Sequence, residues 1–429
     1  MAKEGRFSDN KIDETTKMAE QYSNQICEEI LTTARIKFAI KCLCTAMDLK
    51  KNKNIVFSPS SIYEGLLLVY LASSDDTEKQ LRCKLELPDN DNTQNMITDW
   101  ILHTMEIRNT GEKLPNYKKK TSCWITNSKF VSNVTQRLFK GELELVNFHR
   151  TYYNLKNQIN EFLRRKTKDY IRTPVQFNNI NKEMQVILST VLRLKGKSIK
   201  RNTDRFEQTL RSMHSSKELR SYASRKLKMT VTELPFVDKN ISFFLLIPAW
   251  RYLNEWIVYK ISDLVERLMT KEGIDELRSA LDAELSCGSF EKSEDIIYPD
   301  SFELEDELKM DKLLDKLGIQ DLWQPDKATL SKFTDENLHF GGAIHRTYIK
   351  VTTENIIAST VNMFFTKKEA FFNSSNNINN SACTQNFLWL LYCKESRTIL
   401  FIGSMNKEDP LTPSKKRKGF ANRIRKMFK

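Results

Sequence analysis

The side chains that could perform catalysis are few, and none of them lies in a recognisable catalytic motif. None of the five histidines lies in the H-E-x-x-H motif of a zinc protease. The G-x-S-x-G turn of a serine hydrolase is also absent from the sequence. Gly196-Lys197-Ser198 resembles the end of a phosphate-binding loop, but Val191 stands where the first glycine of such a loop is needed. There is no G-x-G-x-x-G motif either. These observations predict that the chain is not an enzyme, and we expect neither a metal ion nor a cofactor.

A polar segment from Thr366 to Gln385 is the strongest candidate for a functional region. It is rich in Asn and Ser, follows neither the helical nor the strand period, and lies between two apolar stretches. Loops of this length inside a compact domain are usually functional or disordered. We therefore expect a long exposed loop that is held between two strands.

Apolar periodicity predicts the elements that hold this loop, and helices dominate the first part of the chain. Helical spacing is present from about Thr15 to Met47 and again from Gln158 to Arg172. Ile55–Phe57 is a short apolar strand, and a Ser before Ile62 can cap the helix that follows. The sequence thus predicts a strand that leads into a buried helix.

Strands dominate the second part of the chain. Two of them should flank a turn at Asp238-Lys239-Asn240, and the last two are apolar enough to be buried on both faces. A short helix should stop at Gly318, which can adopt the left-handed backbone of a helix terminus. The expected ranges are Val186–Leu188, Met229–Leu234, Ile241–Ile247, Asp311–Leu317 for the helix, Phe387–Tyr392 and Thr398–Ile402. Since no repeat and no linker divides the chain, we expect a single mixed α/β domain.

The composition is that of a folded chain whose positive charge is concentrated at one end. Of the 429 residues 40% are hydrophobic, and the formal net charge is +13. Nine Lys and Arg residues follow Asn406, so the rest is only mildly basic, which weakens any argument that it binds nucleic acid. The eight cysteines have no metal or redox spacing and are expected to be mostly buried thiols. The absence of a signal-like apolar stretch at the start favours an intracellular location, in the cytoplasm or nucleus.

Five sets of residues, in order along the chain, match the motifs of one known family. They are Asn54–Ile62, Ile159–Ile171, Glu233–Phe236 with Leu245–Pro248, Ile344–Val351, and Phe387–Leu390 with Ile399–Gly403. Together they resemble the serpins, a family of serine protease inhibitors. The ordered set carries the resemblance, because any single match could arise by chance.

The resemblance implies a serpin fold, which is a mixed α/β fold with three β-sheets, about nine helices and an exposed reactive-centre loop. We expect an N-terminal extension or helix over residues 1–33, a serpin domain over 34–410 with its loop at about 353–385, and a basic amphipathic tail over 411–429. In the family, a protease attacks the loop and forms an acyl-enzyme. The cleaved loop then inserts into the central sheet as a new strand, driven by stored strain.

The implied function is therefore irreversible inhibition of a trypsin-like or chymotrypsin-like serine endopeptidase by a monomer. The implied partner is that serine protease, held in a covalent complex. Most members of the family are extracellular, which conflicts with the location favoured by the start of the chain.

The residues that the resemblance assigns to the hinge of the loop depart from the pattern of inhibitory serpins. They are Glu354, Asn355, Ile356, Ile357, Ala358, Ser359 and Thr360. Asn355 replaces a glycine, and a run of small residues is missing, so insertion should be handicapped. By strand alternation, however, Ile356, Ala358, Thr360 and Asn362 would face the core, and none of them is charged. The alternative is a non-inhibitory serpin that acts as a binding or interaction protein.

A second implied set, the shutter beneath the central sheet, has a structural role. It comprises Asn54, Ser58, Ser61, Ser189 and His345. Ser189 and Ser198 stand in the places of a family Asn and Trp, which should deprive His345 of a partner and leave the volume of an indole unfilled. We expect His345 to be a core histidine and not a catalytic one.

The usual spacing from the hinge places the reactive bond near Lys368-Glu369. Lys368, or alternatively Lys367, would suit a trypsin-like enzyme, and Phe365 would suit a chymotrypsin-like one. The simpler alternative is that these lysines only make the loop soluble.

The basic tail contains Lys415, Lys416, Arg417, Lys418, Arg423, Arg425 and Lys426. Phe420, Ile424, Met427 and Phe428 would share one face of a helix opposite the charges. Such a tail could be simply solvated, could contact an anionic membrane surface, nucleic acid or an acidic protein, or could direct nuclear import.

Overall fold

A computed structural model gives the arrangement of most of the chain. It describes residues 5–51, 53–90, 95–102, 104, 117–128, 130–171, 182–197, 220–237, 240–252, 255–283, 301–334, 338–352, 355–366, 379–381 and 386–406. Several predicted features lie outside these residues. They are Glu354, Ser198, Lys367, Lys368, Glu369, the turn residues Asp238 and Lys239, most of the polar segment from Thr366 to Gln385, and the whole basic tail.

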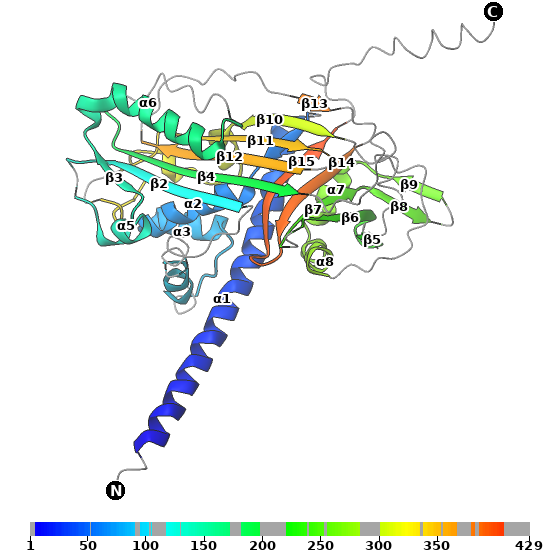
Figure 1. Cartoon of the computed structure of the whole chain (residues 1–429), viewed down its shortest axis with the longest axis horizontal. Coiled ribbons are helices and arrows are strands. Elements are labelled where there is room, and N and C mark those ends of the chain that lie inside the picture. The colour runs from blue at the N-terminus through cyan, green and yellow to red at the C-terminus, as the bar shows by residue number, and fades with distance from the viewer. Residues whose placement is uncertain are drawn as a thin grey trace, which may run out of the picture.

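A seven-stranded sheet forms the centre of the molecule (Figure 1). Its strand order is β13-β10-β11-β12-β4-β2-β3, and all neighbours are antiparallel except β2 and β3. The bounds are β2 Tyr117–Thr126, β3 Leu143–Val146, β4 Val186–Lys197, β10 Phe302–Leu308, β11 Gly342–Val351, β12 Asn355–Phe365 and β13 Asn379–Ser381. β12 is therefore an interior strand, paired along both of its edges.

A six-stranded sheet packs against one end of the first, in the order β1-β15-β14-β7-β6-β5. Its strands are β1 Ile55–Phe57, β5 Arg220–Ser224, β6 Met229–Pro235, β7 Ile241–Ile247, β14 Phe387–Cys393 and β15 Thr398–Met405. A two-stranded ribbon, β8 Ala249–Tyr252 with β9 Glu255–Val258, extends from β7. Every residue of β7, β14 and β15 is buried, which confirms the prediction that the last two strands are covered on both faces.

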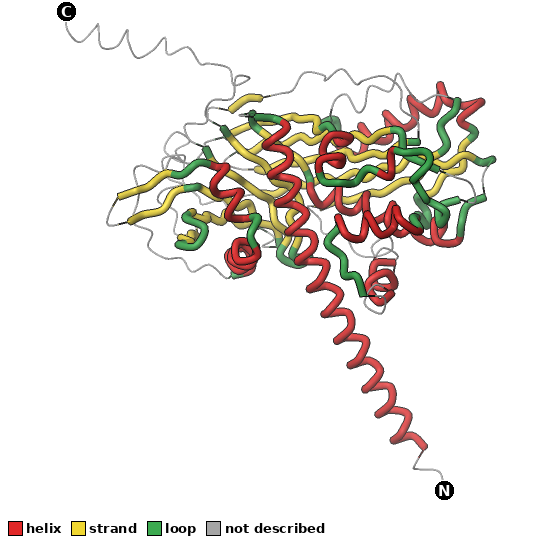
Figure 2. Tube along the Cα trace, turned by 180° about the vertical axis from the view of Figure 1, so that it is seen from behind, coloured by secondary structure: helices red, strands yellow, loops and turns green. Residues whose placement is uncertain are grey.

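Helices cover both faces of the central sheet. They are α1 Gly5–Leu49, α2 Pro59–Ala72, α3 Asp75–Lys84, α5 Asn133–Leu138, α6 Phe148–Thr167, α7 Ile261–Leu268, α8 Lys271–Asp282, α9 Met310–Lys316 and the 3-10 helix η2 Asp321–Trp323. α6 lies across one face (Figure 1), while α1 and α2 belong to the core on the other side, where α1 crosses the strands when seen from behind (Figure 2). Within the described residues, no helix is long and apolar enough to span a bilayer.

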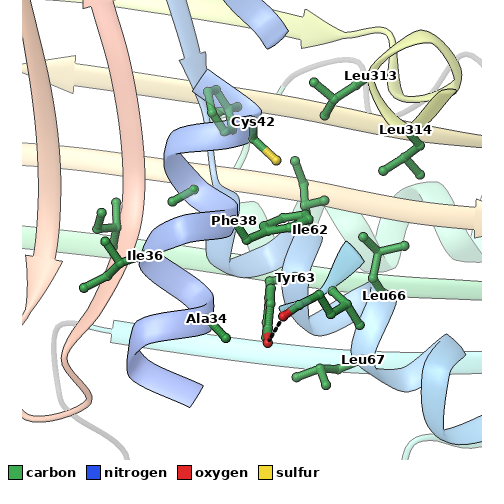
Figure 3. Close-up of a cluster of buried hydrophobic side chains, with 14 of the residues drawn as sticks. Ala34, Ile36, Phe38, Cys42, Ile62, Tyr63, Leu66, Leu67, Leu313 and Leu314 are labelled. Carbon is green, nitrogen blue, oxygen red and sulfur yellow. Dashed lines mark hydrogen bonds between the residues drawn. The ribbon is translucent and has the colours of Figure 1, made fainter. Parts of the chain in front are cut away.

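Helix α2 follows directly from β1, as predicted. Ser58 caps it, since its hydroxyl accepts a hydrogen bond from the amide of Ser61. Tyr63 and Leu66 of this helix pack against Phe38 of α1 and against α9 (Figure 3). The Tyr63 ring meets Phe38 edge-on at 5.2 Å, and its hydroxyl donates to the Leu85 carbonyl.

The termini of two other helices follow from backbone conformation. α9 ends before Gly318, which has a φ of +79°, as predicted. α6 differs from the expected range of 158–172, because it begins ten residues earlier, after the cap Asn147, and ends at Thr167. The early end has a clear cause: Lys168 and Asp169 both have positive φ, which breaks the helical hydrogen-bond pattern.

The first half of α1 extends away from the body of the molecule (Figure 1). Tyr22 is 67% exposed, and the first buried side chain among those that the structure describes in this helix is that of Cys27. From there onwards the helix packs into the core, and it continues without a break through residue 33.

Part of the segment expected as an exposed loop forms a strand instead. Residues 355–365 form β12, a buried strand, so the expectation of exposure across 353–385 is wrong for these residues. Thr366 is also buried, and Asn379–Ser381 pair with β10 at the edge of the sheet.

Candidate functional site

β12 is an uncharged strand that fits between β11 and β4 over its whole length. Its eleven residues pair with Lys197–Ile187 of β4, and all but Asn355 also pair with β11. Asn355 and Ile357 are partly buried, and the other nine residues are fully buried.

The two faces of β12 pack against different parts of the molecule, as strand alternation predicted. Ile356 and Ala358 join the cluster between the two sheets, and Phe364 joins the core around α2. On the opposite face, Val361 and Met363 lie beneath α6, together with Phe365. The strand therefore contributes to three hydrophobic clusters at once.

The polar side chains of β12 find hydrogen-bond partners. Thr360 Oγ1 accepts from Thr347 Oγ1 at 3.0 Å and donates to the Arg346 carbonyl at the same distance. Asn362 Nδ2 donates to the Ser61 carbonyl at 3.3 Å, and Ser359 donates to a carbonyl of β4. A strand with buried hydroxyls and an amide is tolerated here because most of these groups are satisfied.

Hydrogen bonds between Thr352 and Asn355 join the end of β11 to the start of β12. Thr352 Oγ1 accepts from the Asn355 amide at 3.0 Å, and the Thr352 amide donates to the Asn355 carbonyl at 2.9 Å. Asn355 is not among the residues with positive φ. Asn355 stands where the family pattern has a glycine, and here it does not require a strained left-handed backbone.

At the other end of the strand, Thr366 fastens the chain to β4. Its hydroxyl accepts from the amides of Gln185 and Val186 at 2.9 and 3.2 Å. Phe365 is 3% exposed and lies inside the sheet. A reactive bond after Phe365 would therefore leave no chain between the strand and an attached protease.

His345 lies directly beneath β12, on the face that meets α2. Its ring is fully buried, and Nε2 accepts from the Ser58 amide at 3.0 Å. Thr347 Oγ1 lies 3.0 Å from the same nitrogen. Since Nε2 accepts, the neutral ring carries its proton on Nδ1, which has no hydrogen-bond partner among the described residues.

Three of the other residues that the resemblance assigns to this region lie close to His345 or to the strands beside it. Ser58 donates to the Leu400 carbonyl at 2.6 Å, and Asn54 accepts from the Asn406 amide at 2.6 Å, so both tie α2 and β1 to the C-terminal strands. Ser61 binds Asn362 through its carbonyl, while its own hydroxyl has no partner in the described part of the chain.

Ser189 does not belong to this group. It pairs with Met363, and its neighbours Ile187 and Val191 lie in the cluster beneath α6, so its side chain faces away from His345. Thr190, which is buried and pairs with Asn362, faces the His345 side instead. The correction is a shift by one residue, which exchanges the two faces of a strand.

The sequence reasoning missed two residues that complete this region, Thr347 and Gly65. Thr347 gives no local signal, because a Thr on a strand is common. Gly65 does give one, since a glycine inside a predicted helix is unusual and often has a packing reason.

The comparison with protein families decides the identity of the fold. A family model described as Serpin (serine protease inhibitor) matches residues 33–408. The chain belongs to the serpin family. Its similarity to curated relatives is low but extends over most of its length, at 25% identity to serine protease inhibitor 88Ea of Drosophila melanogaster, covering 85% of this chain and 88% of the relative. The leukocyte elastase inhibitor of Equus caballus is 23% identical, with coverage of 87% and 98%.

Solved serpin structures share the fold. Cleaved Serpin 42Da superimposes with a TM-score of 0.64 at 17% identity, over 89% of this chain and 99% of that one. A loop-inserted structure of a cleaved ovalbumin mutant gives 0.63 at 17% identity, with coverage of 87% and 99%. The thermophilic serpin tengpin, in its latent state, gives 0.62 at 17% identity, with coverage of 88% and 97%.

The described residues of this serpin include no group of three or more His, Cys, Asp or Glu side chains that could hold a metal ion. Of the cysteines they contain, Cys27, Cys42, Cys123 and Cys393 are buried, Cys44 is partly buried, and Cys83 is exposed. The reactive bond residues cannot be placed, because they lie outside the described ranges.

Burial holds His345 of this serpin neutral. Loss of solvation, together with a smaller effect of nearby Lys50, lowers the pKa of its imidazole from 6.5 to about 3, and the Asn362 side chain acts in the opposite direction. The unfolded chain therefore binds a proton between pH 6.5 and 3 that the folded chain does not.

Stability should consequently fall on acidification, by about 2 kcal/mol between pH 7 and pH 5 from this residue alone. We expect His345→Gln to reduce this dependence, measured as the free energy of unfolding in denaturant at the two pH values. The pKa of Asp306 is raised by burial, which works in the opposite direction, but it does so in both proteins and cancels in the comparison. An unchanged pH dependence in the folded variant would show that other groups are responsible.

Proposed function

We propose that this serpin is an irreversible, suicide-type inhibitor of a serine endopeptidase, acting by loop cleavage and insertion into the central sheet. The observation that carries the proposal is the fit of β12, whose eleven uncharged residues pair with β4, ten of them also with β11, and pack on both faces. A central strand with a buried charge would be strongly disfavoured. The names of the relatives, inhibitors of serine protease and of leukocyte elastase, support the same class of partner.

In the proposed mechanism, the serine hydroxyl of the protease attacks a peptide bond that follows β12 in the chain. The carbonyl carbon forms an ester with the serine, and the amine of the next residue leaves as the new N-terminus. Residues 355–365, freed at one end, then move from outside the sheet into the position of β12 between β11 and β4, which is the arrangement described above, and carry the enzyme with them. Inhibition results when insertion is faster than hydrolysis of the ester by water.

Lys368 is the favoured residue on the acyl side of the cleaved bond, with Glu369 following it. A bond at this position leaves Thr366 and Lys367 as a short connection between the inserted strand and the enzyme, whereas a bond after Phe365 would leave none. The positive charge of Lys368 suits the acidic specificity pocket of a trypsin-like protease.

Incubation with trypsin and, separately, with chymotrypsin tests the proposal. We expect trypsin to give a complex that survives denaturing electrophoresis, and a cleaved product that melts well above the uncut protein. Lys368→Ala should reduce the rate of complex formation with trypsin more than tenfold, while Lys367→Ala, the matched control, should change it little. The mass of the released peptide identifies the bond.

Cleavage without a complex and without stabilisation would contradict the proposal. It would favour the alternative function, a non-inhibitory serpin that acts as an interaction protein. The basic tail would then be the first candidate for the binding surface, because residues 411–429 carry eight Lys and Arg residues and no Asp or Glu. Binding of the full chain to vesicles with and without anionic lipid, compared with a chain that ends at Asn406, would test that role.

A further inference from the structure

Gly65 occupies the interior of helix α2, where the backbone does not require a glycine. Its φ is not positive, and the residue is buried within a regular helix. Glycine destabilises a helix interior relative to alanine, so its presence calls for another reason. The reason is one of space.

Added to Gly65, a Cβ atom would collide with two side chains of β12. It would lie 2.7 Å from Asn362 Nδ2 and 3.0 Å from a carbon of the Phe364 ring. Contacts this short force the neighbours to move. The third-nearest atom is another carbon of the Phe364 ring.

Neither neighbour can move easily. Asn362 is 1% exposed and is tied to α2 by its hydrogen bond to the Ser61 carbonyl, one turn before Gly65. Phe364 is 1% exposed and packs against Phe340, with 5.5 Å between the ring centroids. Their side chains are held within the core cluster on the α2 side of the sheet.

We propose that Gly65 is a positioning residue that controls insertion, because its missing side chain is the space into which Asn362 and Phe364 dock when residues 355–365 enter the sheet. This inference rests on the proposed function, since it concerns the step that traps the protease. Without β12 in the sheet these two side chains are elsewhere, and a methyl group at residue 65 does not meet them.

Gly65→Ala should therefore affect the two states in opposite directions. Before insertion, alanine strengthens α2, so the uncut, uninserted chain should be as stable as the wild type or more so. After insertion, the methyl group overpacks the core beneath β12, so the inserted form should be weakened. A residue with a merely structural role would shift both states in the same direction.

Hydrogen exchange on the full chain, before and after loop cleavage by trypsin, measures insertion directly. In the wild type the amides of 355–365 should be strongly protected in the cleaved protein. In Gly65→Ala we expect their exchange to be at least tenfold faster, the melting temperature of the cleaved form to fall, and the share of trypsin that escapes as free enzyme to rise. Adding Asn362→Ala, or Phe364→Leu, to Gly65→Ala should restore much of the protection, since each removes one side of the collision.

The outcomes separate this inference from the proposed function. A wild type that protects 355–365 after cleavage but forms no covalent complex would overturn the inhibitor proposal, and Gly65 would still be judged by the exchange data. Equal protection in the wild type and Gly65→Ala, or a failure of both second substitutions to restore it, would overturn the role of Gly65. If Gly65→Ala lowers the stability of the uncut and cleaved chains equally, the residue is only part of the core.

Discussion

Ala358→Asp is expected to abolish covalent inhibition while leaving the loop cleavable. Ala358 has no exposed surface in β12, and it lies in the cluster between the two sheets with Ile349 and Leu194. A carboxylate there would be desolvated with no positive partner provided, which costs several kcal/mol. Insertion should fail, so the protease would hydrolyse its ester and leave.

Denaturing electrophoresis after incubation with trypsin measures this result. We expect the covalent complex to fall below about a tenth of the wild-type amount, and the gain in melting temperature after cleavage to disappear. Ala358→Ser is the milder control, because it adds a single polar atom and no charge. Asn355→Asp is a second control at the partly buried end of the same strand. A complex formed by Ala358→Asp at the wild-type level would show that trapping does not need this part of β12 in the sheet.

The second large effect concerns the six-stranded sheet. Lys394→Met is expected to lower the free energy of unfolding by about 3 kcal/mol, the lower end of the cost of breaking a buried ion pair, because the Lys394 side chain is 29% exposed. Glu233 is fully buried on β6, and Lys394 Nζ lies 2.6 Å from its Oε1. Ser242 donates to the same oxygen at 2.6 Å, so part of the hydrogen bonding survives, but the compensating charge does not.

Denaturant unfolding of the uncut chain tests this prediction. The matched variant is Glu233→Gln combined with Lys394→Met, which removes both charges and should recover most of the loss. A loss below 1 kcal/mol in Lys394→Met alone would mean that the carboxylate is compensated in another way. No change in the pairing of β12 is expected from either variant, because the pair lies in the other sheet.

Local sequence signals were sufficient to predict the elements that depend only on residues nearby in the chain, whatever the position of β12. The paired strands β6 and β7 follow from two apolar runs around a turn, and β14 and β15 from their continuous apolarity. The start of α2 follows from the hydroxyl of Ser58, and the end of α9 from Gly318. Each of these features depends on residues close together in sequence.

The position of β12 could not be predicted in the same way. Its residues are apolar enough for an interior strand, but whether they occupy the sheet or an exposed loop is a choice between two global arrangements of one sequence. The surroundings of His345 depend on that choice, since Asn362 reaches the region only as part of β12. The face of Ser189 was mistaken for a different reason, because strand alternation has a period of two and an error of one residue reverses the side.

β12 lies in the sheet of a chain whose sequence runs without interruption from Phe365 to the edge strand that begins at Asn379. β12 can therefore occupy the gap between β11 and β4 without cleavage of a peptide bond. If the proposed function holds, molecules with β12 in the sheet and molecules able to trap a protease can have the same mass and the same sequence, and they differ only in conformation. The amount of protein in a sample then overstates the amount that can act, and the age of the sample becomes a variable in every assay.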